Sequence, residues 1–261
     1  MKNASNIVVE SPIDGISRIR LNELSTYNAL SSKTLESLIN IFKSLNNKNE
    51  TKVIIIEGSG KGFSGGHDLK ELRSLKKKSK YKKLFNLCSK LMLEIVEGRK
   101  PVIAKVHGAA FAAGCQLVAS CDLAISSDDA IFATPGVNIG LFCSTPMVAV
   151  SRKVSRKKTM KMLLTGDPIN AKYAKEIGLI NDHYPISELE DEVLKLAKKI
   201  ASKSNLIIKI GKKAFYKQLE MPLSKAYQYT SEVMTKNAMK LDAEEGISAF
   251  LEKRKPNWKN K

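Results

Sequence analysis

The sequence is poor in the residues that build metal centres, and it lacks long apolar runs. It contains three histidines and four cysteines, with no CxxC pair, and the histidines lie far apart. This spacing predicts no metal site, and the apolar surroundings of the cysteines predict buried thiols in a reducing compartment. No run of about 18 apolar residues occurs, which excludes a membrane-spanning helix.

The N-terminal sequence has no feature of a targeting peptide. Residues 1–15 (MKNASNIVVESPIDG) pass directly into a strand-like pattern, without an apolar h-region or an Arg-rich amphipathic stretch. We therefore expect a cytoplasmic protein, or one in an organelle matrix if a targeting segment has been removed. With 261 residues, 43% of them hydrophobic, the chain is long enough for one large domain with an appendage.

Positive charge dominates the ionisable residues. The 44 lysines and arginines exceed the 26 aspartates and glutamates by 18. This balance favours polyanionic partners such as nucleic acid, an acidic membrane surface or a phosphate-bearing ligand. Lysine is scattered over every segment, however, which indicates a general surface bias. The densest cluster, residues 76–83 (KKKSKYKK), lacks the interleaved aromatics of a platform for single-stranded nucleic acid. We therefore expect neither a nucleic acid nor a membrane as partner.

The first half of the chain alternates between strand and helix patterns. Apolar or alternating runs predict strands at 6–10, 16–21, 53–57, 101–106 and 123–126. Capped or amphipathic stretches predict helices at 31–45, from Asp68 onward, at 81–97 and at 114–120. After about Val150 only helix-like segments follow, at 157–164, 171–177, 189–202, 207–216, 223–239 and 243–253. The pattern predicts an α/β core followed by a helical C-terminal region.

A glycine-rich loop at residues 63–72 (FSGGHDLKEL) follows the strand predicted at 53–57. Gly65 and Gly66 allow a sharp turn, and Asp68 then caps a helix. The His67 amide lies at the start of this helix, where backbone N–H groups have no intrahelical acceptor. Such an amide is a ready donor to an anion or to a developing oxyanion.

A second strand-to-helix loop, at residues 107–122 (HGAAFAAGCQLVASCD), has the same character. Its small residues permit close backbone approach, and the Ala113 amide stands at the start of the following helix. Either loop alone is equally consistent with a tight packing turn. Two such amides that converge on one oxygen would form an oxyanion hole without any polar side chain.

Together, the two loops resemble those of the crotonase family, also called the enoyl-CoA hydratase/isomerase family. The resemblance extends over nearly the whole chain. It includes Asn28-Ala29-Leu30-Ser31, DDAIFATPGVNIG at 128–140, Leu164-Thr165-Gly166 and AFLEKRKPNW at 249–258. Within the family, the chain is most similar to the enoyl-CoA hydratase domain-containing members, which carry the Gly-His-Asp-Leu and Gly-Cys-Gln-Leu forms.

The resemblance implies an α/β fold with a spiral of ββα units over residues 1–195 and a C-terminal helical oligomerisation region over residues 196–261. It also implies a homotrimer or a dimer of trimers that binds an acyl-CoA thioester, whose oxygen lies between the His67 and Ala113 amides. The implied acyl-CoA contacts are Gly65, Gly66, His67, Asp68, Leu69, Lys70, Ala113, Met234 and Lys253. The last two would touch the CoA of a neighbouring subunit. The coenzyme A of the substrate is the only cofactor expected.

Three carboxylates are absent from the positions at which the resemblance places catalytic groups. Family hydratases use two glutamates to move protons, and those positions hold Gln116 and Gly136 here. An isomerase branch uses an aspartate where this chain has Ser144. Neither an amide nor a glycine can shuttle a proton at pH 7, and losing one acid–base group typically lowers the rate about 10²–10⁴-fold. The sequence therefore predicts enolate stabilisation with weak or absent hydratase activity.

Three main functions stay open on this pattern, besides other thioester chemistry such as hydrolysis. A hydratase or isomerase with relocated groups could use Gln116 to orient a water, with Asn138, Cys143, Ser144 or Thr145 near the pocket. A decarboxylase acting on a malonyl-type thioester would form the enolate without a base, and the His67 loop also resembles that of methylmalonyl-CoA decarboxylases. The third is an acyl-CoA binder without catalytic activity. We expect an enzyme of this family and leave the reaction open.

Overall fold

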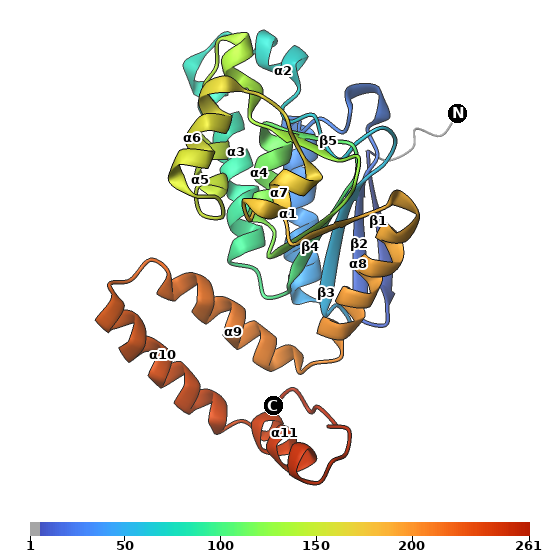
Figure 1. Ribbon diagram of the computed structural model, residues 1–261, viewed down its shortest axis with the longest axis vertical. Helices are drawn as coiled ribbons and strands as arrows, with labels where there is room; N and C mark the ends of the chain where they lie inside the picture. The colour runs from blue at the N-terminus through green and yellow to red at the C-terminus, as the bar shows by residue number, and fades with distance from the viewer. Residues whose placement is uncertain (1–5) are drawn as a thin grey trace.

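A six-stranded sheet forms the centre of the computed structural model, which describes residues 6–261 (Figure 1). The strand order is β1-β2-β3-β4-β6-β9, and every neighbouring pair is parallel except β1 with β2. The strands are β1 (Ile7–Ile13), β2 (Ile16–Leu21), β3 (Val53–Gly58), β4 (Val102–Val106), β6 (Leu123–Ser127) and β9 (Asp182–Tyr184). β3 is buried along its whole length because helices cover both faces of the sheet, which explains its unbroken apolar run.

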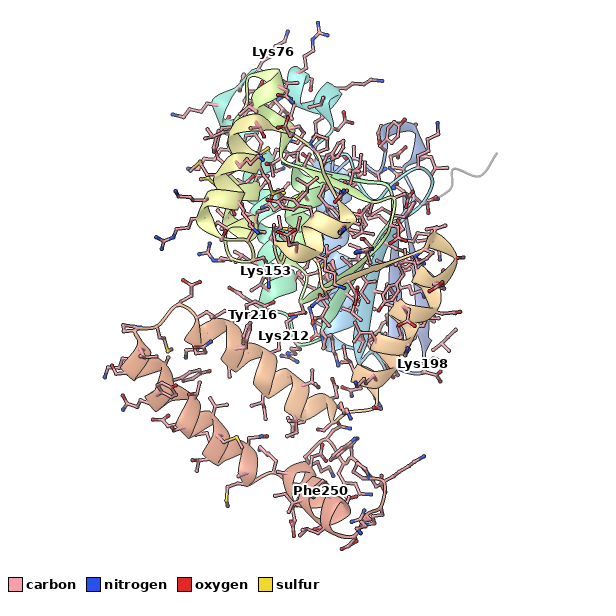
Figure 2. The ribbon with its side chains drawn as sticks, in the orientation of Figure 1. Lys76, Lys153, Lys198, Lys212, Tyr216 and Phe250 are labelled. Atoms are coloured by element: carbon pink, nitrogen blue, oxygen red, sulfur yellow. The ribbon has the colours of Figure 1, made fainter. Side chains whose placement is uncertain are left out.

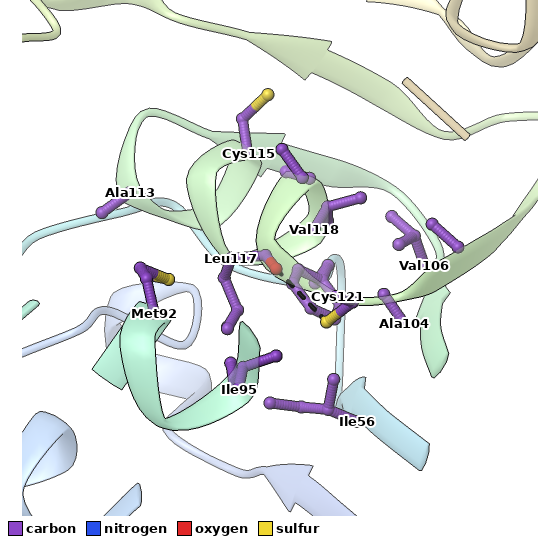
Figure 3. Close-up of a cluster of buried hydrophobic side chains, with 14 of the residues drawn as sticks. Ile56, Met92, Ile95, Ala104, Val106, Ala113, Cys115, Leu117, Val118 and Cys121 are labelled. Atoms are coloured by element: carbon purple, nitrogen blue, oxygen red, sulfur yellow. Dashed lines mark hydrogen bonds between the residues drawn. The ribbon is translucent and has the colours of Figure 1, made fainter. Parts of the chain in front are cut away.

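One face of the sheet packs against the helices that form the main apolar core. These are α1 (Ser32–Asn47), α3 (Lys78–Val96) and α4 (Ala113–Ser120). α1 begins where the sequence predicted, because the Ser31 hydroxyl accepts a hydrogen bond from the Thr34 amide at 3.2 Å. Leu35, Leu38 and Phe42 recur at helical spacing and face the core. Every residue of α4 is buried in this core, part of which is drawn in Figure 3.

The opposite face of the sheet is covered by α8 (Ile186–Ala201), which forms a second apolar core. Leu189, Val193, Ala197 and Ala201 recur every four residues, so all four lie on the side of α8 that faces the sheet. The predicted division of the chain between residues 195 and 196 thus falls inside α8. The residues of α8 before the division and those after it both pack on the sheet. The oligomerisation role of the residues beyond stays a prediction.

A second, three-stranded sheet carries the second of the two predicted loops. Its order is β5-β7-β8, from β5 (Ala109–Phe111), β7 (Ile131–Ala133) and β8 (Ile169–Asn170). β5 is parallel to β7, and an isolated parallel bridge joins Ser64 to Ala110 of β5. Successive turns of strand, strand and helix therefore stack into a spiral, as expected. The sequence did not reveal these strands or β9, because two or three residues carry too short a pattern.

Short helices connect these layers. They are η1 (Leu24–Thr26), α2 (Leu69–Ser74), η2 (Pro135–Ile139), α5 (Pro146–Val150), α6 (Arg156–Thr165) and α7 (Ala171–Glu176). Asp68 caps α2 as predicted, because its carboxylate accepts the amides of Lys70 at 2.8 Å and Glu71 at 3.2 Å. Within residues 6–261, no helix combines the length and the apolar composition needed to cross a bilayer.

Three helices form a C-terminal arm at the end of the molecule away from α2 (Figure 1). They are α9 (Asn205–Gln218), α10 (Leu223–Ala238) and α11 (Leu241–Leu251). Lys212 docks the arm, since its Nζ donates to the carbonyls of Ile95 and Lys100 at 2.8 and 2.9 Å and to Asp122 Oδ2 at 2.6 Å. The Tyr216 hydroxyl donates to Asp122 Oδ1 at 3.0 Å, and Figure 2 shows both side chains pointing from α9 toward the core. This buried network fixes α9 against the end of α3 and the start of β4.

Candidate active site

Backbone hydrogen bonds hold the two predicted loops side by side. The Ser64 amide donates to the Ala109 carbonyl at 3.0 Å, and the Phe111 amide donates to the Ser64 carbonyl at 2.9 Å. Ser64 is buried, and its hydroxyl donates to the Asn28 carbonyl at 2.9 Å and accepts the Gly66 amide at 3.2 Å. The chain on either side of Ser64 is therefore fixed in direction before it reaches His67.

Two glycines allow the backbones of the loops to approach closely. Gly66 has a φ of +91°, and a Cβ at this position would lie 2.9 Å from the Phe111 carbonyl oxygen and 3.1 Å from the Ala113 nitrogen. A Cβ at Gly114 would lie 2.3 Å from the Ser64 carbonyl oxygen. Any larger residue would push the loops apart, so these glycines are required by the contact itself.

The amides of His67 and Ala113 are free donors at this junction. Within residues 6–261, neither amide donates to an acceptor of the protein. Their predecessors are both engaged: Gly66 N–H by the Ser64 hydroxyl and Ala112 N–H by the Ala133 carbonyl at 2.9 Å. Ala112 has a φ of +48°, a rarely adopted value for a residue with a Cβ, where the chain turns from β5 into α4. The structure therefore brings the two predicted donors together with their hydrogens unused.

The imidazole of His67 packs between two other elements. Its Nδ1 lies 3.2 Å from the Leu30 carbonyl oxygen, which can only accept, so Nδ1 carries the proton. The ring meets the Phe85 ring of α3 edge-on, with centroids 5.6 Å apart. Burial lowers the pKa of His67, and its buried Nε2 has no partner among the described residues. The imidazole is therefore neutral at pH 7, and it anchors the loop to the segment before α1 and to α3.

Asn28 is a supporting residue that our sequence analysis did not assign to the site. It adopts a φ of +55°, and its Nδ2 donates to the carbonyls of Ser59 and Gly62, both at 2.9 Å. Its Oδ1 accepts the Glu23 amide at 2.9 Å. The side chain thus bridges two stretches of loop beneath Ser64. Its signal in the sequence was the Asn28-Ala29-Leu30-Ser31 segment, which carried the resemblance without revealing this role.

Gln116 lies in α4, one turn after Ala113, and is buried. Its Oε1 accepts a weak hydrogen bond from the Cys88 thiol of α3 at 3.6 Å. Burial raises the pKa of Cys88 to about 12, so this thiol is protonated at neutral pH. The side chains available near this position are therefore an amide and a neutral thiol, and neither is a base.

Gly136 has no room for a side chain. A Cβ there would lie 2.7 Å from the Leu141 carbonyl oxygen and 2.9 Å from the Cys143 sulfur. The segment folds back on itself through a hydrogen bond from the Leu141 amide to the Gly136 carbonyl at 2.9 Å. Ser144 follows on an exposed loop, where its hydroxyl donates to the Phe142 carbonyl at 3.3 Å. A carboxylate at position 136 would require this whole turn to move.

The sequence profile of the family described as enoyl-CoA hydratase/isomerase matches residues 13–261. The chain belongs to the enoyl-CoA hydratase/isomerase family. Human enoyl-CoA hydratase domain-containing protein 3, mitochondrial, is 49% identical over 94% of this chain and 81% of the human protein. Its Danio rerio counterpart is 46% identical over 99% of this chain and 89% of that protein. The predicted resemblance is therefore confirmed, including its similarity to the domain-containing protein 3 type.

Solved structures of the enoyl-CoA hydratase/isomerase family confirm the fold. Enoyl-CoA hydratase from Mycobacterium smegmatis superposes with a TM-score of 0.96 at 43% identity and covers 98% of this chain and 99% of its own. Human enoyl-CoA hydratase domain-containing protein 3 superposes with a TM-score of 0.94 at 47% identity and covers 97% and 100%. The crotonase-type spiral predicted from the sequence is thus the observed architecture.

The remaining predicted CoA contacts of this enoyl-CoA hydratase/isomerase family member lie in two places. Gly65, Leu69 and Lys70 are exposed beside the two amides, whereas Asp68 is partly buried as a cap. Met234 and Lys253 are exposed on the C-terminal arm, and α10 and α11 lie far from α2 in the same chain (Figure 1). Their predicted contact with a neighbouring subunit stays a prediction. No group of three histidine, cysteine or carboxylate side chains in residues 6–261 is placed to hold a metal ion.

Proposed function

We propose that the protein binds an acyl-CoA thioester and stabilises its enolate between the His67 and Ala113 amides, with weak or no hydratase activity. The observation that carries this proposal is the pair of adjacent backbone donors without a protein acceptor. One such donor contributes on the order of 3 kcal/mol to the stabilisation of a developing oxyanion. Because both donors belong to the backbone, the hydrogen bonds that they offer do not depend on the chemistry of the side chain at either position.

Weak hydration follows from the groups that surround the amides. Hydration needs one group to take a proton from water and another to protonate the α-carbon. The Gln116 amide can orient a water but cannot accept its proton. The space beside Gly136 is filled by the Leu141 carbonyl and the Cys143 thiol, whose pKa is raised by burial. Neither position therefore supplies a base or an acid near neutral pH.

Calorimetry with crotonyl-CoA and acetyl-CoA tests the binding step directly. We expect saturable binding by the purified protein and very slow conversion of crotonyl-CoA to its hydrated product. If the folded protein binds neither thioester, the proposal is wrong. If it hydrates crotonyl-CoA at the rate of a typical family hydratase, the assignment of weak activity is wrong.

Decarboxylation of a malonyl-type thioester is the second candidate, and the filled space at Gly136 favours it. In this reaction the bond between the α-carbon and the carboxylate breaks and CO₂ leaves. The electron pair of the broken bond stays on the acyl group and forms the enolate. The two amides would hold the enolate oxygen, and water would then protonate the α-carbon. The step needs an oxyanion hole and no protein base, which matches the groups that are present.

Deuterium labelling separates this candidate from the others. In D₂O, decarboxylation of malonyl-CoA yields acetyl-CoA with one deuterium at the α-carbon, measured by mass spectrometry. Butyryl-CoA should gain none, because removal of its α-proton requires a base. Product from neither malonyl-CoA nor crotonyl-CoA, together with tight binding, would instead favour a non-catalytic acyl-CoA binder.

We also propose a homo-oligomer, a trimer or a dimer of trimers, with no cofactor besides the coenzyme A of the substrate. Exposed apolar side chains on the C-terminal arm support the oligomer, such as Tyr227 at 69%, Met239 at 83% and Phe250 at 83% exposure. Light scattering measures the mass. The relatives described as mitochondrial support an organelle matrix, as an alternative to the cytoplasm.

A further inference from the structure

Nearly half of the excess positive charge gathers on α2 and the first three turns of α3. Residues 69–90 contain nine lysines and arginines and one glutamate, a net +8 out of the +18 of the chain. We call this surface the lysine end. All nine cationic side chains are exposed. Figure 2 shows Lys76 at one extremity of the molecule, opposite the end formed by the C-terminal arm, which carries Phe250.

The carboxylates near the lysine end do not neutralise it. Glu71 is turned inward, where its Oε2 accepts the Ser32 amide at 2.9 Å. Lys83 lies 3.9 Å from Glu36, and within residues 6–261 no other cation of the lysine end forms an ion pair. Apart from Lys70, which is a predicted acyl-CoA contact, the positive charge of the lysine end is therefore available to an external partner.

The placement of these lysines opposes the local stability of α3. Positive charge at a helix N-terminus is unfavourable because it meets the positive end of the helix dipole. α3 nevertheless begins at Lys78 and includes Lys80 in its first turn, and the preceding Lys77 provides no side-chain cap. Lys76 also adopts a φ of +48°. Residues that lower local stability, with no compensating contact inside the protein, indicate that the segment has a role other than stabilising the fold.

The shape and chemistry of the lysine end fit phosphate groups on a surface. A shallow depression of about 390 Å³ on α3 is lined by Ser79, Lys82, Lys83, Asn86, Leu87 and Lys90. Tyr81, the one aromatic of the 76–83 run, stacks on Phe85 with centroids 6.5 Å apart and is not free to stack on a base. Lysine ammoniums are hydrated point charges that suit a field of anionic headgroups, whereas contacts to nucleic-acid bases draw on arginine and on aromatic stacking, the second of which the lysine end does not offer.

We propose that the lysine end binds the anionic headgroups of a phospholipid bilayer as a peripheral contact. A polybasic segment of this kind is attracted to acidic lipid within a Debye length of the surface. The contact revises our expectation of no membrane partner, which the even scatter of lysine in the sequence had suggested. It does not depend on the proposed reaction, because its readout involves no acyl-CoA.

Vesicle co-sedimentation of the full chain tests this contact. The vesicles are phosphatidylcholine alone or with about one third phosphatidylserine, at low and high salt. The protein should sediment with the acidic vesicles at low salt and with neither kind at high salt. Replacing Lys77, Lys78 and Lys80 by Gln should lower the partition coefficient at least about tenfold, since three juxtamembrane lysines together contribute roughly 100-fold.

A matched variant controls for total charge. Lys48, Lys199 and Lys203 are exposed, lie outside the lysine end and form no ion pair within residues 6–261, so their replacement by Gln removes the same charge. This control should bind acidic vesicles like the unchanged protein. The melting temperature of the Lys77, Lys78 and Lys80 variant should stay equal or rise, which excludes unfolding as the cause of lost binding. Equal loss in both variants would overturn the proposal. Failure of the unchanged protein to bind acidic vesicles, or binding of single-stranded RNA alone by the same lysines, would overturn it as well.

Discussion

The two halves of the candidate site differ in the kind of group that each would contribute. In the first half, residues 62–68 and 108–114, the donors are backbone amides of two loops joined by main-chain hydrogen bonds. Glycines at 66 and 114 allow the contact, and buried Ser64 and Asn28 brace it. The geometry is therefore a property of the fold, and losing it would disturb the packing of both loops.

The second half, Gln116 and residues 134–145, depends on side chains. Gln116 stands in the buried helix α4, where a glutamate would have nearly the same shape, so the side chain there can be exchanged without changing the packing of α4. At Gly136 the turn leaves no room for a side chain, because the Leu141 carbonyl and the Cys143 sulfur occupy the space beside it. The comparison teaches that hydrogen-bond donors supplied by the backbone persist with the fold, whereas a chemical group supplied by a side chain can be exchanged without harm to the fold.

The largest effect should come from Gly66→Ala, which breaks the first half. A Cβ at +91° would press on the Phe111 carbonyl and the Ala113 nitrogen. Because it displaces both amides, acyl-CoA affinity and any enolate chemistry should fall by about 10²-fold or more. Calorimetry and the malonyl-CoA assay measure the loss.

Gly178→Ala is the control for the strain alone. Gly178 has a φ of +81°, so an added Cβ is strained there as well. The atom nearest to that Cβ would be the Lys153 carbonyl oxygen at 3.3 Å, away from both loops. It should lower stability without lowering acyl-CoA affinity. Similar affinity losses in the two variants would mean that the junction of the loops is not the binding site.

Gln116→Glu should have the next largest effect, because it adds an ionisable side chain to the second half. A carboxylate in α4 can take a proton from water, so crotonyl-CoA hydration should rise by about 10²-fold, the lower end for one acid–base group. Gln116→Leu should give no gain. Adding Gly136→Glu should give no further gain, because that side chain collides with the Leu141 carbonyl and Cys143. A rate that stays unchanged in Gln116→Glu would show that residue 116 does not reach the reacting atoms.

The parts that the sequence predicted correctly depend on local chemistry. The Ser31 and Asp68 caps, the buried run of β3 and both loops follow from residue types at short range. The resemblance extended this to the whole spiral. Short-range patterns failed where strands were only two or three residues long, as in β8 and β9.

The parts that the sequence could not predict depend on tertiary approach. Nothing in the local sequence indicates that the Leu141 carbonyl closes the space beside Gly136, which leaves no room for a glutamate at this position. The same holds for Asn28 beneath Ser64 and for Phe85 against His67. These contacts join segments far apart in the chain, and they decide what the site can hold.

Gly136→Ala sharpens the comparison by disturbing the second half alone. Its Cβ would lie 2.7 Å from the Leu141 carbonyl, so overpacking should lower the free energy of unfolding by about 1–3 kcal/mol. Acyl-CoA affinity should change much less than in Gly66→Ala, because the two amides are untouched. Gly211→Ala in α9 meets nothing within 4 Å and should be neutral or slightly stabilising. Denaturation by urea measures the free energy of unfolding of the Gly66→Ala, Gly136→Ala and Gly211→Ala variants, and calorimetry measures their acyl-CoA affinity. An affinity loss in Gly136→Ala as large as in Gly66→Ala would show that the two halves of the site are not separable.

The smallest expected effect is the change in protein stability with pH, to which His67 of the first half and the buried thiols around Gln116 contribute differently. Burial lowers the pKa of His67 below its ordinary value of 6.5, so the unfolded chain binds the extra proton first as pH falls. Stability should therefore decline below about pH 6.5, by at most about 1.4 kcal/mol per pH unit from this group, and His67→Leu should flatten that decline.

The buried thiols act at the opposite end of the pH range. Burial raises the pKa of Cys88 and Cys115 from 9.0 to about 12, so their contribution to stability is lost only as pH rises above 9. Urea titrations from pH 5 to 10 should thus assign the acid limb to the His67 loop and the alkaline limb to the buried thiols, among them Cys121, whose pKa burial also raises. An acid limb that survives unchanged in His67→Leu would mean that other groups set it.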